Sequence, residues 1–246
     1  MGTSDMNVLE LQGVSVRYRK QKIRSLKEMV IRTVTRHART PDFYSLHDVS
    51  LTIHTGESVA IIGANGAGKS TLLRVAAGII APSEGVVVAR GTVAPLMELG
   101  TGFEAELSGR ENIHFNGALL GRTRAQMLEQ MEAIVAFSGL EEQIDAPLRT
   151  YSTGMTARLA FAVATAIEAD TILLDEILAV GDASFRERCE ERIAAFVRQG
   201  TTVVLVTHDL EAAVEICKRA VWISHGRIVA DGPSAEIVAR YKTGHE

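Results

Sequence analysis

The sequence contains few cysteines, few aromatic residues and no long uncharged apolar stretch. Of its 246 residues only two are cysteines, Cys189 and Cys217, and phenylalanine, tyrosine and tryptophan together make up 5%. Two cysteines without a spacing pattern argue against a disulfide framework or a zinc site, and they are typical of a reducing compartment. Because 46% of the residues are hydrophobic and only 5% are aromatic, the core must be built mainly from aliphatic side chains.

The sequence also lacks the features of a membrane or nucleic-acid protein. Its most apolar tract, residues 159–167, is closed off by Glu168 and Asp170 and is too short to cross a bilayer. No N-terminal stretch has the layout of a signal peptide. A formal net charge of −4 provides no general attraction for phosphate backbones. We therefore expect a cytosolic protein without a nucleic-acid partner.

The length and the order of the patterns predict one α/β domain. Residues 8–18 and 47–54 read as strands, the second with Val49, Leu51 and Ile53 on one face. Short apolar strands without alternation follow at 59–63, 171–175 and 202–207, as in a buried parallel sheet. A helix is predicted over 122–138, and the tail reads as strands 220–224 and 227–230, then a helix capped by Ser234. The predicted parts of the single domain 1–246 are an antiparallel β lobe at 1–57 with a basic helical insertion at 19–39, an α/β core at 58–96 and 170–246, and a helical subdomain at 97–169.

A glycine-rich loop follows the first core strand. Residues 63–71 satisfy the pattern G-x-x-x-x-G-K-S/T between strand 59–62 and a helix predicted over 71–77. In such a loop backbone N–H groups surround a β-phosphate, the lysine contacts β/γ oxygens and the hydroxyl binds Mg2+. The loop predicts a nucleoside triphosphate but no particular reaction. The residues expected to bind it are Gly63, Ala64, Asn65, Gly66, Ala67, Gly68, Lys69, Ser70 and Thr71.

A second strand ends in two neighbouring carboxylates, Asp175 and Glu176. A buried strand has little reason to end in two acids unless a cation or a water needs them. We expect Asp175 to join Ser70 in the Mg2+ shell and Glu176 to act as the general base on the attacking water. His208, at the end of another strand, is a candidate donor to the γ-phosphate, although a single histidine there is more often a cap or core residue.

In this order the motifs resemble the ABC ATPase family over essentially the whole chain. Residues 151–155, Tyr-Ser-Thr-Gly-Met, look like the signature usually written L-S-G-G-Q. The resemblance implies that Ser152 and Gly154 contact the γ-phosphate of ATP held by a second subunit, so that two copies form a head-to-tail homodimer. It also implies a dimer-contacting loop at Asp182.

Two further family positions are less regular. Tyr18 fits the aromatic residue that stacks on adenine, with a buried strand residue as the alternative. Where most members carry a glutamine that touches Mg2+ and water, this sequence has Glu98 nearest the position. The signature also differs, with Thr153 and Met155 in place of glycine and glutamine.

The sequences of residues 97–103, 107–112 and 151–155 look like those of ATPases of polysaccharide exporters. This group exports O-antigen, capsular polysaccharide, galactan and teichoic acid. That resemblance implies an integral membrane permease, in two copies, and a peripheral position on the cytoplasmic face of the cell membrane. It also implies a role for residues 19–39 in admitting a lipid-linked glycan headgroup; a solvated basic face is the alternative. We expect no C-terminal carbohydrate-binding domain.

Two other functions remain open from sequence. One is a soluble ABC ATPase acting on DNA or ribosomes, which would need long coiled coils or two joined cassettes, and neither is visible. The other is an importer or a small-molecule exporter. Only the sequences of residues 98–112 and 151–155 argue against it.

Overall fold

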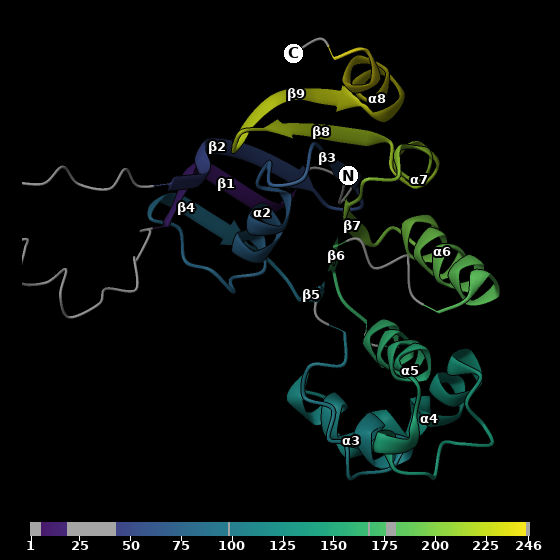
Figure 1. Ribbon diagram of the computed structural model, residues 1–246. Coiled ribbons are helices and arrows are strands. Elements are labelled where there is room, and N and C mark those ends of the chain that lie inside the picture. The colour runs from purple at the N-terminus through teal and green to yellow at the C-terminus, as the bar shows by residue number, and fades with distance from the viewer. Residues whose placement is uncertain (1–5, 19–42, 98, 167, 176–180, 245–246) are drawn as a thin grey trace, which may run out of the picture.

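The computed structural model describes residues 6–18, 43–97, 99–166, 168–175 and 181–244. Two β-sheets and a group of helices make up the described chain (Figure 1). The helices α3 (Gly109–Leu119), α4 (Arg124–Ser138) and α5 (Thr153–Thr165) gather at one end, away from β8 (Arg219–Ser224), β9 (Arg227–Pro233) and α8 (Ser234–Thr243) (Figure 1). Among the described residues no helix is long and apolar enough to cross a membrane.

The smaller sheet is antiparallel, with strand order β2-β1-β4. Its strands are β1 (Asn7–Tyr18), β2 (Phe43–His54) and β4 (Glu84–Ala89). Val49, Leu51 and Ile53 are buried on one face of β2, as predicted. The prediction placed residues 58–96 in the α/β core, and β4 is an exception. It pairs with β1, with Leu9 opposite Ala89, and therefore belongs to the smaller sheet. Four of its six residues are exposed and two are half-buried, so its sequence pattern did not distinguish it from an edge strand of the core sheet.

The larger sheet has the order β5-β6-β7-β3-β8-β9, parallel except for β9. Its strands are β3 (Ser58–Ile62), β5 (Val93–Leu96), β6 (Thr171–Asp175), β7 (Thr202–Val206), β8 (Arg219–Ser224) and β9 (Arg227–Pro233). All five residues of β3 and of β7 are buried, because helices and the second sheet cover both faces. The strands predicted at 59–63, 171–175 and 202–207 are thus observed within two residues.

Four helices connect and cover the core strands. They are α2 (Lys69–Ala76), α6 (Ala183–Arg198), α7 (Leu210–Ile216) and α8 (Ser234–Thr243). The predicted cap of the last helix is wrong. Pro233 occupies the N-cap position of α8, and the Ser234 hydroxyl donates instead to the Cys217 carbonyl at 2.6 Å. Proline fixes an extended backbone at that point without offering a side-chain acceptor.

The helical part contains α3 (Gly109–Leu119), α4 (Arg124–Ser138), a 3-10 turn η2 (Leu148–Thr150) and α5 (Thr153–Thr165). Capping boxes begin α3 at Ser108 and α4 at Thr123. Met127, Met131 and Ile134 lie buried on one face of α4 and pack with α3 and α5 in a separate cluster, as the spacing predicted.

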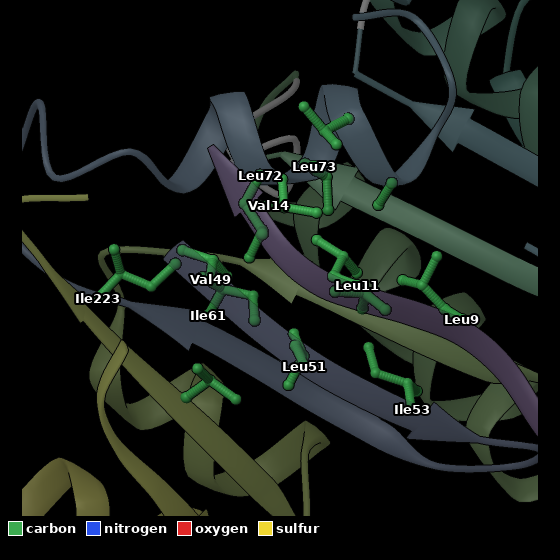
Figure 2. Packing of buried hydrophobic residues seen from close by; sticks show 14 of the residues in the cluster. Leu9, Leu11, Val14, Val49, Leu51, Ile53, Ile61, Leu72, Leu73 and Ile223 are labelled. Atoms are coloured by element: carbon green, nitrogen blue, oxygen red, sulfur yellow. The ribbon is translucent and has the colours of Figure 1, made fainter. Parts of the chain in front are cut away.

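The main core lies between the two sheets. Leu11 of β1, Leu51 of β2 and Ile61 of β3 pack there with Leu73 of α2 (Figure 2). A second cluster covers the other face of the larger sheet, where Phe161, Phe185 and Trp222 are buried. Because α2 packs into the first cluster, the loop that precedes it is fixed relative to both sheets. The predicted insertion 19–39 lies outside the described residues.

Candidate functional site

Three adjacent parallel strands end at one edge of the larger sheet. Val206 of β7 is level with Asp175 of β6 on one side and with Ile61 of β3 on the other. Gly63 lies two residues after Ile61 and is buried. His208 lies two residues after Val206 and is exposed. Carboxyl ends of parallel strands are where α/β folds bind ligands. The predicted phosphate loop, Asp175 and His208 are therefore brought together.

The glycines of the loop are required by backbone conformation. Gly63, Gly66 and Gly68 have φ of 148°, 80° and 111°, values that favour glycine. A Cβ at Gly63 would lie 2.2 Å from the Ile223 carbonyl oxygen, whereas a Cβ at Gly66 would meet nothing within 4 Å. The loop is thus packed tightly on its inner side and open on its outer side. Ala64, Asn65 and Gly66 are exposed there, and Ala67 is buried.

Lys69 lies across this loop and not in solvent. Its side chain is buried, and Nζ donates to the carbonyls of Gly63 at 2.8 Å and Ala64 at 3.1 Å. An ammonium group has three N–H donors, and the bonds to the described residues account for two of them. Gly68 is the N-cap of α2 without a side-chain cap, so the first N–H groups of the helix add to this positive end.

Ser70 and Thr71 form the first turn of α2 and are half-buried. The Thr71 hydroxyl lies 2.7 Å from the hydroxyl of Ser45 on β2. Sequence reasoning missed Ser45, because no motif marks it. Only the fold brings β2 against the phosphate loop.

The residues expected at a magnesium ion are compatible with one. Ser70 and Asp175 supply a hydroxyl and a half-exposed carboxylate at the same sheet edge. No group of three or more His, Cys, Asp or Glu side chains able to hold a metal occurs within the described part of the chain. Mg2+ typically takes one or two protein ligands and completes its shell with phosphates and water, which this donor set fits.

Tyr18 ends β1 opposite Phe43 of β2. Its side chain is 44% exposed and that of Phe43 is 52% exposed, so Tyr18 is not a core residue. An exposed ring at a strand end offers a face for stacking on a planar ligand.

The signature-like segment opens helix α5. Ser152 is the N-cap, exposed, and its hydroxyl accepts from Met155 N at 3.2 Å. A Cβ at Gly154 would meet only Ser152 Oγ, at 3.9 Å, so the space around this N-terminus is open. The segment therefore presents N–H groups and a hydroxyl on the surface, as a helix N-terminus does for anions. Within the described part of the chain no hydrogen bond joins this segment to the phosphate loop.

Asp182 is the N-cap of α6. Its Oδ1 accepts from Phe185 N at 3.0 Å and from Ser184 Oγ at 2.9 Å, and Oδ2 lies 2.5 Å from Arg158 Nη2. The Phe185 N–H first, then Ser184 and Arg158, hold the pKa of Asp182 below its usual value of 3.8. Arg158, on the helix that follows Ser152, was not singled out from sequence, although it is a charge just ahead of an apolar tract.

Glu176 and Glu98 lie outside the described residues, so their expected roles rest on the sequence. Residues 99–102 next to Glu98 line a groove of about 610 Å³ between the larger sheet and the helical part. Its apolar rim includes Ile79, Leu119 and Leu120, which are 56%, 60% and 46% exposed.

Comparison with known proteins agrees with this geometry. The profile of the family described as "ABC transporter" matches residues 46–179. The chain is 45% identical over 200 residues to the O-antigen export system ATP-binding protein RfbB of Klebsiella pneumoniae, covering 81% of each. It is 37% identical to the teichoic acids export ATP-binding protein TagH of Listeria monocytogenes, over 81% of this chain and 59% of that protein.

Solved structures show the same fold. A dimeric ATP-binding cassette, MJ0796 bound to ADP and Pi, superposes with a TM-score of 0.72 at 22% identity, over 92% of this chain and 98% of that one. An ATP-binding subunit of an ABC transporter gives 0.76 at 24% identity, over 96% and 93%. With a phosphate loop, an acidic strand end and a signature helix on this fold, the chain belongs to the ABC transporter family as an ATP-binding ATPase subunit.

Proposed function

We propose that this ATPase subunit powers export of a lipid-linked polysaccharide or teichoic acid across the cytoplasmic membrane. The ATPase chemistry is supported mainly by the register of three strands, in which Asp175 and Ile61 both pair with Val206. This register brings the acidic strand end to the same sheet edge as the phosphate loop. The names of the relatives in Klebsiella and Listeria support the cargo class.

Each residue of the sheet edge has a proposed task. The loop 63–71 binds the phosphates of ATP through backbone N–H groups, and Lys69 neutralises the β/γ oxygens. Ser70 and Asp175 hold Mg2+, which supplies charge stabilisation on the phosphates when bound. Glu176 takes a proton from the attacking water, and His208 donates to the γ-phosphate. Tyr18 stacks on adenine, and Glu98 takes the place of the usual glutamine.

ATP also joins two copies of the chain. Ser152 and Gly154 of one copy donate to the γ-phosphate bound by the other, and Asp182 lies at the same contact. The exposed N-terminus of α5 and its open surroundings support this arrangement, because a surface hydroxyl and N–H groups need an anionic partner brought from outside. Closure of the homodimer on ATP and its reopening after hydrolysis are the mechanical output.

The groove lined by residues 99–102 and Leu119 is the proposed contact for an integral membrane permease, in two copies. Exposed large apolar side chains along a groove are typical of a protein contact. The subunit would thus lie on the cytoplasmic face of the membrane, with residues 19–39 available to a lipid-linked headgroup.

Glu176→Gln tests the hydrolytic assignment. Removing the general base should slow ATP turnover by roughly 10²- to 10⁴-fold while leaving ATP binding intact. Turnover is measured by phosphate release and binding by titration with a fluorescent nucleotide. ATP should also trap the variant as a dimer on size-exclusion chromatography. Turnover at the wild-type rate would contradict the role of Glu176.

A further inference from the structure

One buried side chain fixes the loop that follows the groove. Asn112 on α3 is 0% exposed, and its Oδ1 accepts from Glu104 N at 2.7 Å. Its Nδ2 donates to the carbonyls of Glu104 at 2.9 Å, Leu107 at 3.1 Å and Ser108 at 2.9 Å. A single carboxamide therefore contacts four backbone groups of residues 104–108, with two N–H donors shared among three carbonyls, which makes the conformation of this loop depend on Asn112.

The same loop is bonded to the segment just before the signature. Leu148 N donates to the Leu107 carbonyl and Arg149 N to the Ala105 carbonyl, each at 2.9 Å. Ser108 and Pro147 form an antiparallel bridge. The surface loop 104–108 and the turn η2 are thus held together by backbone hydrogen bonds.

Close packing continues this connection to Ser152. A Cβ at Gly109 would lie 2.5 Å from the Tyr151 hydroxyl and 2.8 Å from Ile144 Cδ1, so the start of α3 fits tightly against the residue before the signature serine. The Tyr151 hydroxyl donates to the Gln143 carbonyl at 2.7 Å, which fixes the ring. Loop 104–108, segment 143–151 and the start of α5 form one connected unit.

The outer side of this unit is accessible. Glu104, Ala105 and Glu106 are exposed, and one residue separates them from Gly102, which lines the groove. A partner seated in the groove would press on these residues. Its displacement would reach Ser152 through the bonds just described and the packing of α3, and also through Ala160 and Ala164 of α5, which line the same groove.

We propose that Asn112 is a positioning residue for coupling: it holds loop 104–108 against residues 147–149, so that movement of the membrane subunit changes the position of Ser152. This role rests on the proposed function, because it needs a membrane subunit in the groove. The side-chain hydrogen bonds of Asn112 to described residues reach only loop 104–108, and its effect is expected on coupling rather than on the chemistry of one subunit.

Asn112→Asp tests this role with little change in volume. The carboxylate still accepts from Glu104 N, but it places an oxygen against the three carbonyls and releases the loop. The measurement is ATP turnover of the full chain alone and with the membrane subunit that co-purifies from native membranes, reconstituted in lipid nanodiscs. Turnover alone should stay near wild type, while stimulation by the membrane subunit should fall by about 2- to 30-fold. Stimulation equal to wild type would overturn the proposal.

Met131→Ala separates coupling from general stability. Met131 is 3% exposed in the cluster shared by α3, α4 and α5, and among the described residues it has no hydrogen bond with loop 104–108. The variant should lower the thermal midpoint as Asn112→Asp does, yet keep stimulation by the membrane subunit. Loss of stimulation in both variants to the same degree would mean that Asn112 acts only through stability, and would overturn the proposal.

A covalent link provides a rescue. Ser108 and Pro147 are a non-hydrogen-bonded antiparallel pair, for which Cα atoms lie about 4.5 Å apart, close enough for a disulfide. Ser108→Cys with Pro147→Cys, added to Asn112→Asp, should restore stimulation when oxidised and lose it with reductant. The native Cys189 and Cys217 do not interfere, since burial raises the pKa of both thiols to about 12.

One outcome of the rescue is decisive. An oxidised, cross-linked protein that remains unstimulated would overturn the positioning role of Asn112. If Asn112→Asp does not fold, Asn112→Ser, which keeps one donor and one acceptor, replaces it in the same series. A wild-type chain that no membrane subunit stimulates would contradict export itself, and that result is distinguishable because it needs no variant.

Discussion

The Ser45 hydroxyl lies 2.7 Å from the Thr71 hydroxyl, and this contact joins the antiparallel sheet to the first turn of α2. Thr71 ends the loop that carries Lys69 and Ser70. A strand distant in sequence therefore helps to orient the hydroxyl at the edge of the phosphate site.

Ser45→Ala should weaken ATP binding as well as stability. Loss of the hydrogen bond between the two hydroxyls should lower the free energy of unfolding by about 0.5–1.5 kcal/mol. Because Thr71 then loses its partner, ATP affinity should fall by about 2- to 10-fold. Urea unfolding and fluorescent-nucleotide titration measure the two effects. Ser50→Ala is the matched control, because Ser50 on the same strand accepts from Gly13 N at 3.0 Å, away from the loop. Equal effects of both variants on ATP affinity would contradict a specific role of Ser45.

Lys69→Ala should act mainly on nucleotide affinity. A charge-assisted hydrogen bond contributes about 1.5–3 kcal/mol, so the dissociation constant for ATP should rise by about 10- to 150-fold. Lys218→Ala, which removes an exposed lysine elsewhere, should leave it unchanged. If Lys69→Ala bound ATP with wild-type affinity, the proposed contact between Lys69 and the phosphates would be contradicted.

The two loop glycines should differ in their tolerance of a side chain. Gly66→Ala meets nothing within 4 Å and carries only the backbone strain of φ 80°, so unfolding free energy should fall by about 1–2 kcal/mol. Gly63→Ala places Cβ 2.2 Å from the Ile223 carbonyl oxygen and should cost more than about 4 kcal/mol. Urea denaturation of both variants checks the order, and a more stable Gly63→Ala would contradict the tight inner packing.

The Asp182 carboxylate predicts an acid-side change in stability. Its pKa is lowered in the folded chain, so its stabilising contribution is present above the unfolded value and is lost as pH falls through the folded pKa. The stability difference between wild type and Asp182→Asn should be constant from about pH 7 to 5 and should shrink below about pH 4. Chemical denaturation across this range measures it. A difference that grows with acid would reverse the assigned direction.

Much of the fold was predictable because its strands differ in pattern. The continuous apolar runs of β3, β6 and β7 indicated a buried parallel sheet, and alternation at Val49, Leu51 and Ile53 indicated a one-sided strand. Strand β4 was misplaced because its partner β1 lies far away in sequence and its side chains are only partly buried. The cap at Ser234 was wrong because proline, one residue earlier, already occupies that position.

The candidate site was predictable where chemistry and backbone constrain neighbouring residues. A phosphate loop needs its glycines and lysine at fixed spacing, so residues 63–71 were found directly. Ser45, Arg158 and Asn112 act through contacts between distant segments, and their residue types alone are unremarkable. Positions of this kind are visible only once the fold is known.

The central claim is that the chain hydrolyses ATP to drive a glycan-exporting membrane subunit. It is tested most directly by purifying tagged Glu176→Gln protein from native membranes in mild detergent with ATP, and identifying by mass spectrometry what accompanies it. We predict recovery of a polytopic membrane protein together with a lipid-linked glycan, whose repeat unit would name the cargo. Recovery of soluble proteins or nucleic acid alone would contradict the export function, although the ATPase chemistry would remain.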